Sequence, residues 1–180
     1  MQVNNNANNL QQLISNALSK ISHLTPSSTK IWLYTSNRTL TQPEQIAIQQ
    51  EIDTFCSTWS SHSIGLKSAG EIIYNEFLLL AVDEDTKDAS GCSIDKSLHF
   101  IQQLEKKYTL SLLNRKILKY YENNTIHTTD FDTFITQKSL PKDKDIAIFN
   151  PLVSSLQDFE QNFIQPLHTS WITKLLTVTK

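Results

Sequence analysis

The stretch that decides the fold runs from residue 77 to residue 95 and reads Phe77-Leu78-Leu79-Leu80-Ala81-Val82, then Asp83-Glu84-Asp85, then Ser90-Gly91-Cys92-Ser93-Ile94-Asp95. Six consecutive apolar residues predict a strand that is buried on both faces. The acidic residues predict a loop, and the small polar residues predict the first turn of a helix. Because ligands of α/β domains often bind where a strand leads into a helix, this junction is the first candidate site.

The segments around this stretch show strand and helix patterns in a definite order. Strand patterns occupy residues 31–35, 66–74, 77–82 and 116–121, and helix patterns begin at Thr41 and Ser93. The order β-α-β-β-α-β is that of the ferredoxin-like split βαβ fold. The sequence therefore predicts an α+β fold with one antiparallel sheet, strand order 4-1-3-2, and both helices on one face.

Charges along the predicted strands agree with this order. The first and third strands, which the fold places in the middle of the sheet, carry no charged residue. The second strand carries Lys67 and Glu71, and the fourth carries Lys116 and Lys119. Since charged side chains protect edge strands from aggregation, we expect the second and fourth strands at the edges.

Further segments precede and follow this core, which we place at residues 30–122. Apolar residues from Leu10 to Leu24 recur at helical spacing after a run of asparagines. We treat residues 1–24 as an Asn-rich tract with an amphipathic helix that packs on its own domain or on a partner. Residues 25–180 are expected to form a single domain. Its α/β extension at 123–180 should contain a helix from about Thr129, a strand at 146–149 and a helix from Ser155.

The composition excludes several classes of protein. The chain has 16 basic and 18 acidic residues, so no basic excess is available for nucleic acid or an anionic membrane. No apolar stretch approaches the roughly 20 residues of a membrane span, and no signal peptide is visible. Two cysteines, Cys56 and Cys92, are too few for a disulfide framework. We therefore expect a cytoplasmic protein.

The three glycines, Gly65, Gly70 and Gly91, exclude two nucleotide-binding motifs. A Walker A loop needs two glycines five positions apart, followed by lysine, because its backbone N–H groups surround the phosphates. The dinucleotide fingerprint needs three closely spaced glycines. Neither pattern is present, so a P-loop ATPase is excluded and no cofactor is expected.

Four stretches of the chain resemble a family of short, uncharacterised bacterial proteins. They are residues 32–38, which end in Ser-Asn-Arg, residues 71–75, residues 89–95, which contain Ser-Gly-Cys-Ser-Ile-Asp, and residues 148–150. Such proteins are sometimes labelled ABC transporter ATPases, a label that the missing Walker A loop argues against. The resemblance implies an identity and no mechanism.

Cys92 is the strongest candidate for a catalytic residue. A thiol at the start of a helix lies near unpaired N–H groups that favour the thiolate. The neighbouring acids Asp85, Asp88 and Asp95 disfavour it, and no histidine adjoins Cys92 in the sequence. We therefore expect Cys92 to be structural, filling the turn, with a catalytic nucleophile as the alternative. Cys56 lies beside an apolar helix face and is expected to be core packing.

The acids that follow the apolar strand are weak candidates for a metal site. Asp83, Asp85 and Asp88 could provide oxygen ligands for Mg²⁺ or Ca²⁺. An EF-hand loop counted from Asp83 would need a third acid at Lys87 and a glycine at Asp88. A solvated loop fits this pattern better than a metal site does.

An anion could bind at the backbone N–H groups of Ser90, Gly91, Cys92 and Ser93, as at other helix N-termini. The alternative is that Ser93 caps the helix and needs no ligand. Asn37 and Arg38 follow the first strand and are a further candidate anion site. Arg38 is expected to pair with Asp83 or Asp95.

The predicted order also matches RNA-recognition modules, which stack bases on aromatic residues of the sheet. The third strand lacks their basic-aromatic pattern, and we expect Trp32 and Tyr34 to lie under the C-terminal extension. The sequence favours a non-enzymatic binding protein with a protein partner, or a homo-oligomer, through the N-terminal helix or the sheet face. The alternative is a small enzyme that uses Cys92 or a metal at the acidic loop.

Overall fold

β5 (Phe77–Asp83) is the centre of the first sheet, and all of its residues are buried. It pairs antiparallel with β1 (Thr29–Thr35) on one side and with β4 (Lys67–Ile73) on the other. The turn from β4 to β5 uses positive φ angles at Tyr74 and Asn75. The predicted central position of this strand is confirmed.

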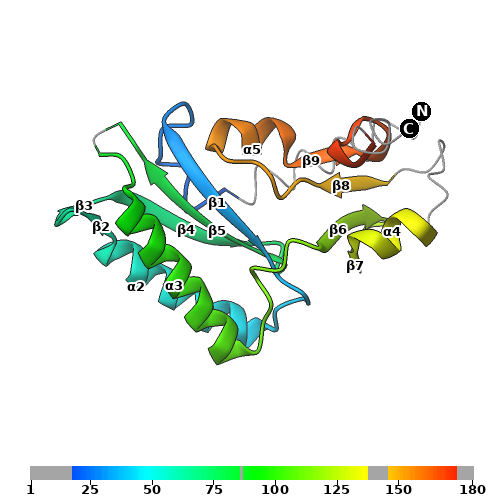
Figure 1. The fold of residues 1–180 in the computed structure, drawn as a ribbon, viewed down its shortest axis with the longest axis horizontal. Coiled ribbons are helices and arrows are strands. Elements are labelled where there is room, and N and C mark those ends of the chain that lie inside the picture. Colours follow the sequence, from blue (N-terminus) through cyan, green and yellow to red (C-terminus); the bar gives the residue numbers. More distant parts are fainter. Residues whose placement is uncertain (1–17, 86, 138–145, 174–180) are drawn as a thin grey trace.

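The computed structural model describes residues 18–85, 87–137 and 146–173, which form an α+β fold with more than one antiparallel sheet (Figure 1). The other elements of the described part are, in order, α2 (Gln42–Thr58), β2 (Ser60–Ser61), β3 (Ile64–Gly65), α3 (Gly91–Tyr108), β6 (Ile117–Glu122), β7 (Thr125–Asp130), α4 (Phe131–Gln137), β8 (Ala147–Phe149), α5 (Leu156–Asn162), β9 (Ile164–Pro166) and the short 3₁₀ helix η1 (Leu167–Thr169).

Different parts of the chain cover the two faces of the β1-β5-β4 sheet. Because side chains alternate along a strand, Leu78 and Leu80 pack with α2 and α3, whereas Leu79 and Ala81 pack with α5. Figure 1 shows α2 and α3 together on one face and α5 on the other. The prediction that both main helices share a face is confirmed.

Trp32 and Tyr34 of β1 lie on the α2–α3 face, so their predicted position under the C-terminal extension is wrong. The Trp32 ring lies 5.6 Å from the ring of Trp59, which follows α2. Their neighbours Ile31 and Leu33 face the extension instead, because residues next to one another in a strand point to opposite faces.

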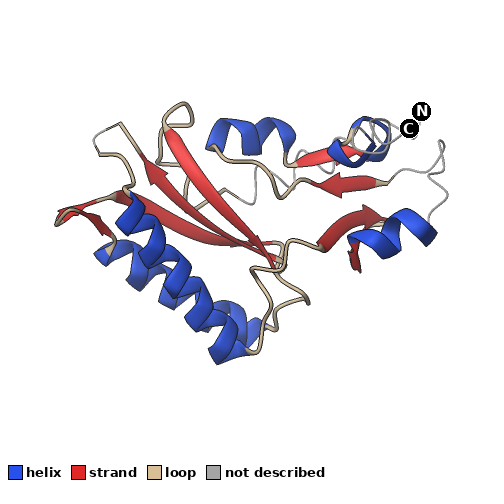
Figure 2. Cartoon of the chain, viewed as in Figure 1, coloured by secondary structure: helices blue, strands red, loops and turns tan. Residues whose placement is uncertain are grey.

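The predicted fourth strand, β6, lies in a second sheet with the order β7-β6-β8-β9 (Figure 2). The described residues therefore do not form the four-stranded sheet 4-1-3-2 of the ferredoxin-like fold. The expected edge position of β6 is also wrong, since β7 and β8 pair with it on both sides. Lys119, which suggested an edge, is buried and pairs with Glu76.

Part of the C-terminal extension pairs with the edge of β1 where β6 was expected. The Ile31 N–H donates to the Ser154 carbonyl oxygen at 3.0 Å, and Lys30 and Ser155 form an antiparallel bridge. The predicted strand and helix of this extension are present as β8 and α5, and Ser155 caps α5. The residues near Thr129 form β7, and the helix expected there begins at Phe131.

Most of the predicted N-terminal helix lies outside the described residues, including Leu10, Leu13, Ile14 and Ala17. Residues 18–23 form turns, and Ile21 and Leu24 are buried in the core between β1-β5-β4 and α5. The Ser19 hydroxyl and the Lys20 N–H donate to Glu71 at 2.9 and 3.0 Å. The part next to β1 therefore packs on its own domain.

None of the helices in the described ranges is both long enough and apolar enough to cross a bilayer.

Candidate functional site

The carboxylate of Asp83, the first of the candidate metal ligands, accepts hydrogen bonds from several protein groups. Its buried carboxylate accepts from Lys67 Nζ at 2.6 Å, the Ser28 hydroxyl at 2.7 Å and the Thr25 N–H at 3.1 Å. Burial raises the pKa of Asp83, but these hydrogen bonds outweigh it and hold the pKa well below its usual range. Asp83 therefore ties the segment before β1 to the end of β5.

The other acids of this loop do not complete a metal site. Asp85 and Asp88 are exposed, and Glu84 accepts the Ala89 N–H at 3.1 Å. The described residues contain no cluster of three or more histidine, cysteine or acidic side chains that could hold a metal ion. The candidate metal ligands Asp83, Asp85 and Asp88 are therefore not brought together into a cluster among the described residues.

Cys92 lies in the first turn of α3 and is exposed, so its expected role as a buried filler of the turn is wrong. Ser90, not Ser93, is the N-cap, and its hydroxyl accepts the Ser93 N–H at 3.4 Å. The Ser93 hydroxyl is buried and donates to the Ser90 carbonyl at 2.7 Å. Gly91 is exposed beside them. Of the four backbone N–H groups predicted to bind an anion, capping thus uses that of Ser93.

Asn37 and Arg38 lie at the opposite end of the sheet from Asp83. In the antiparallel β1–β5 register, Thr29 pairs with Asp83 and Thr35 with Phe77, so the end of β1 is remote from the acidic loop. The predicted pairing of Arg38 with Asp83 or Asp95 is therefore wrong.

Arg38 instead binds Glu44 with two nitrogens, at 2.9 and 2.7 Å, and also donates to the Tyr108 carbonyl at 3.0 Å. This guanidinium, helped by Thr41, lowers the pKa of Glu44 to about 2. Asn37 Oδ1 accepts the Ser111 N–H at 2.8 Å. Arg38 therefore connects the end of β1 to the start of α2 and the end of α3, and Asn37 connects it to the segment after α3.

Cys56 is buried in the core between α2 and the sheet, which confirms the packing role predicted for it. Burial, followed by the negative charge of Asp53, raises the pKa of the Cys56 thiol to about 12. A thiol of this kind is not a nucleophile at neutral pH.

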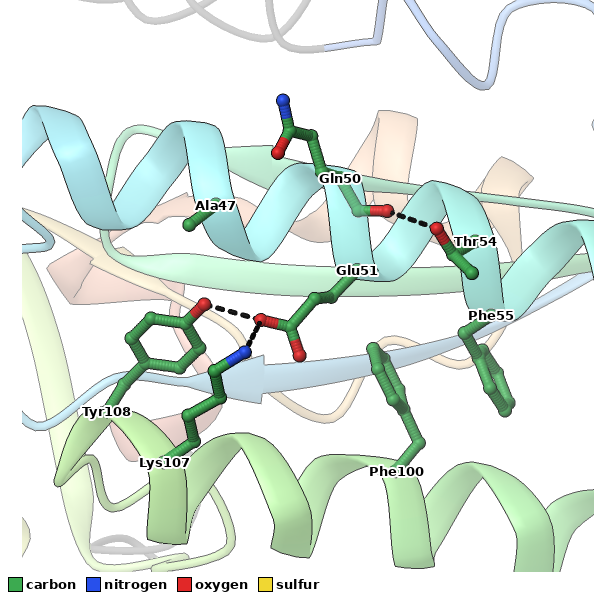
Figure 3. A pocket seen from close by; sticks show the side chains of 8 residues that line it. All are labelled: Ala47, Gln50, Glu51, Thr54, Phe55, Phe100, Lys107 and Tyr108. Atoms are coloured by element: carbon green, nitrogen blue, oxygen red, sulfur yellow. Dashed lines mark hydrogen bonds and ion pairs between the residues drawn. The ribbon is translucent and has the colours of Figure 1, made fainter.

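A shallow groove of about 490 Å³ runs between α2 and α3 (Figure 3). Figure 3 shows Glu51 accepting from Lys107 and from the Tyr108 hydroxyl, with Phe55 and Phe100 beside them. The Phe55 and Phe100 rings stack with centroids 4.4 Å apart. Burial raises the pKa of Glu51, yet the bonds from Lys107 and Tyr108 lower it overall. These groups satisfy one another and join the two helices.

A larger groove, of about 580 Å³, follows the free edge of β1 and is called the β1 groove below. Its volume lies within the roughly 300–1,000 Å³ of typical ligand sites. One wall comes from α3 and the other from residues 151–153 and Trp171. It is lined by Ile31, Trp32, Leu33, Tyr34, Thr35, Ile94, Ser97, Leu98, Leu112, Leu113, Asn114, Arg115, Ile117, Pro151, Leu152, Val153 and Trp171.

The β1 groove exposes backbone groups that a sheet normally pairs. Ser36 N–H donates toward the β5 side, to the Glu76 carbonyl at 2.8 Å, and Ile31 N–H points the other way, to Ser154. Consecutive residues of an antiparallel strand direct their N–H and C=O groups to opposite edges of the strand. The N–H and C=O of Leu33 therefore point away from β5, as the N–H of Ile31 does. Outside the strand ladders, no hydrogen bond of the described residues involves the N–H or C=O of Leu33, and in its sheet β1 has β5 as its one strand neighbour.

Exposed apolar side chains flank the same groove. Four large apolar side chains of the described residues are exposed: Ile46 (56%), Ile64 (54%), Leu98 (40%) and Leu152 (68%). Leu98 and Leu152 both line the β1 groove, one on each wall. An apolar groove with unpaired backbone groups can bind an extended peptide without any catalytic group.

Sequence reasoning missed the β1 groove. The groove combines residues from β1, α3 and the C-terminal extension, so its composition depends on the tertiary fold. Its backbone groups have no side-chain signature. The one available signal was the charge-free segment 31–35, which we had wrongly interpreted as a central strand, since β1 lies at the edge of the β1-β5-β4 sheet. Comparison of the chain with protein-family models, with curated proteins and with solved structures found no match.

Proposed function

We propose that this chain is a non-enzymatic binding protein that holds a segment of another polypeptide in the β1 groove. The observation that carries this proposal is the unpaired outward N–H and C=O of Leu33 beside an apolar groove of about 580 Å³. The edge of a sheet binds extended peptides through its backbone groups, and apolar walls add affinity. Leu98 and Leu152 provide such walls.

The chemistry of the other candidate sites supports binding over the enzyme alternative. Cys92 is exposed and does not line the β1 groove, and Asp83 is buried among protein donors. A cytoplasmic location belongs to the proposal, and the two free cysteines agree with a reducing compartment. Membership of the family of short bacterial proteins stays a prediction, as does partner binding through the amphipathic helix expected within residues 1–24.

A display library of random linear peptides, panned against the immobilised protein, tests the proposal. We expect enriched peptides to bind the protein in solution and to bind the double variant Leu98→Asp, Leu152→Asp about tenfold or more weakly. The double variant Ile46→Asp, Ile64→Asp is the matched control, because it changes the two comparable exposed side chains outside the groove. Equal binding to both variants, or no enrichment at all, would contradict the proposal.

A further inference from the structure

An added strand already begins at the Ile31 end of β1. Ser154 and Ser155 pair antiparallel with β1 there. The preceding residues, 151–153, leave the edge and become a wall of the β1 groove. Pairing with the extension therefore ends at Ile31, and the N–H and C=O of Leu33 are the next backbone groups on the same edge of β1. An added strand satisfies such groups.

The side chains on the two walls indicate what such a strand would carry. Ile94 and Leu98 form part of the α3 wall, and Leu152 and Trp171 form part of the opposite wall. Successive side chains of a strand point to opposite faces. Both sets of side chains on an added strand would therefore meet apolar groups, as in a strand buried on both faces. Consecutive apolar residues fit this groove better than alternating ones.

Arg115 is the one charged side chain among the described residues that line the groove. The described residues form no ion pair with it. Arg115 belongs to the segment between α3 and β6. In that segment the Ser111 N–H donates to Asn37, two residues beyond β1, which places the segment at the Thr35 end of the strand. A strand antiparallel to β1 enters at that end, so an acidic residue before its apolar run would be complementary to Arg115.

From these three observations we infer the partner of the β1 groove: a short extended run of apolar residues, preceded by Asp or Glu, that adds to β1 as an antiparallel strand. This inference rests on the proposed function. A second copy of the chain fits less well. Its own β1 edge lies between two walls, and such a recessed edge cannot approach the Leu33 backbone closely enough to pair.

Amide hydrogen exchange measured by NMR tests the inference with the peptide acetyl-Glu-Val-Ile-Val-Ser-amide as the probe. We expect the peptide to slow exchange of the Leu33 N–H about tenfold or more. The Ile31 N–H, already bonded to Ser154, is the internal control and should not change. Replacing Glu by Lys in the peptide should weaken binding, and the Arg115→Glu variant should reverse that preference.

The outcomes separate the inference from the proposed function. Binding that depends on Leu98 and Leu152 without protection of the Leu33 N–H overturns the added strand and leaves the proposed function intact. Slow exchange of the Leu33 N–H in the absence of peptide also overturns the added strand in two cases. One is that the exchange slows further as the protein concentration rises. The other is that a variant truncated after Thr173 loses the slow exchange. Failure of the probe and of every panned peptide to bind in the groove overturns both.

Discussion

Lys119 of β6 and Glu76 of the turn between β4 and β5 form an ion pair whose side chains are 0% and 4% exposed. Lys119 also donates to the Thr128 hydroxyl at 2.6 Å, and the Thr39 hydroxyl donates to Glu76. Burial lowers the pKa of Lys119, and Glu76 opposes that effect. Because Glu76 lies in the turn that joins two strands of the first sheet and Lys119 lies in a strand of the second, the pair connects the two sheets.

Removing one partner should therefore destabilise the protein strongly. Glu76→Gln leaves the buried ammonium of Lys119 without a counter-charge, and we expect a loss of about 3–5 kcal/mol in the free energy of unfolding, measured with urea. The double variant Glu76→Leu, Lys119→Met removes both charges and should recover most of that loss. A loss below about 1 kcal/mol in the single variant would mean that the pair does not hold the sheets together.

This pair also explains why the predicted position of β6 was wrong. A lysine in a strand pattern usually marks an edge, and nothing in the local sequence identifies Glu76, 43 residues away, as its partner. The order of the first sheet was predictable because the apolar run 77–82 of β5 had to be central. The helices were predictable from local signals such as the Thr41–Glu44 capping box.

The candidate site was less predictable than the fold. Candidate residues were chosen for reactive side chains, and the structure places Arg38 and Asp83 at opposite ends of an antiparallel pair. The β1 groove depends on the backbone of Leu33 and on Leu152, an apolar residue in a turn. Neither differs in the sequence from an ordinary core residue.

Asp83 should make stability dependent on acidic pH. Its folded pKa is lowered, so its contribution is present above the unfolded value of about 3.9 and is lost as the pH falls toward the folded value. At pH 7 we expect Asp83→Asn to cost about 1.5–3 kcal/mol, because charged hydrogen bonds from Lys67 and Ser28 are lost. Below about pH 4 the difference from the unmodified protein should shrink.

Thermal unfolding followed by circular dichroism across the acidic range measures this effect. Asp85→Asn is the matched control, since Asp85 is exposed and only its backbone N–H contacts Asp83. A difference between Asp83→Asn and the unmodified protein that is the same at pH 7 and pH 3 would show that the charge of Asp83 does not stabilise the fold.

Gly70 is required by the close approach of α2 to the β1-β5-β4 sheet. A Cβ atom at this position would lie 2.5 Å from Ile52 Cγ2 and 2.9 Å from the Leu79 carbonyl oxygen. Since the carbonyl belongs to the central strand and cannot move freely, we expect Gly70→Ala to cost about 1–3 kcal/mol in urea unfolding. Gly65→Ala is the control because nothing lies within 4 Å of its Cβ, and its effect should stay within about 0.5 kcal/mol. Equal effects at both positions would refute the packing argument.

The two cysteines should differ in their reaction with iodoacetamide. Cys92 is exposed, whereas Cys56 is buried and the pKa of its thiol is raised to about 12, mainly by burial. In the native protein we therefore expect a single alkylated thiol by mass spectrometry, which Cys92→Ser should abolish. Cys56 should react only after unfolding, and Cys56→Ser should leave native labelling unchanged.

We also expect Cys92 to react no faster than free cysteine at pH 7, because no base adjoins it in the sequence. A much faster reaction would contradict the expectation that Cys92 is not catalytic and would favour the enzyme alternative.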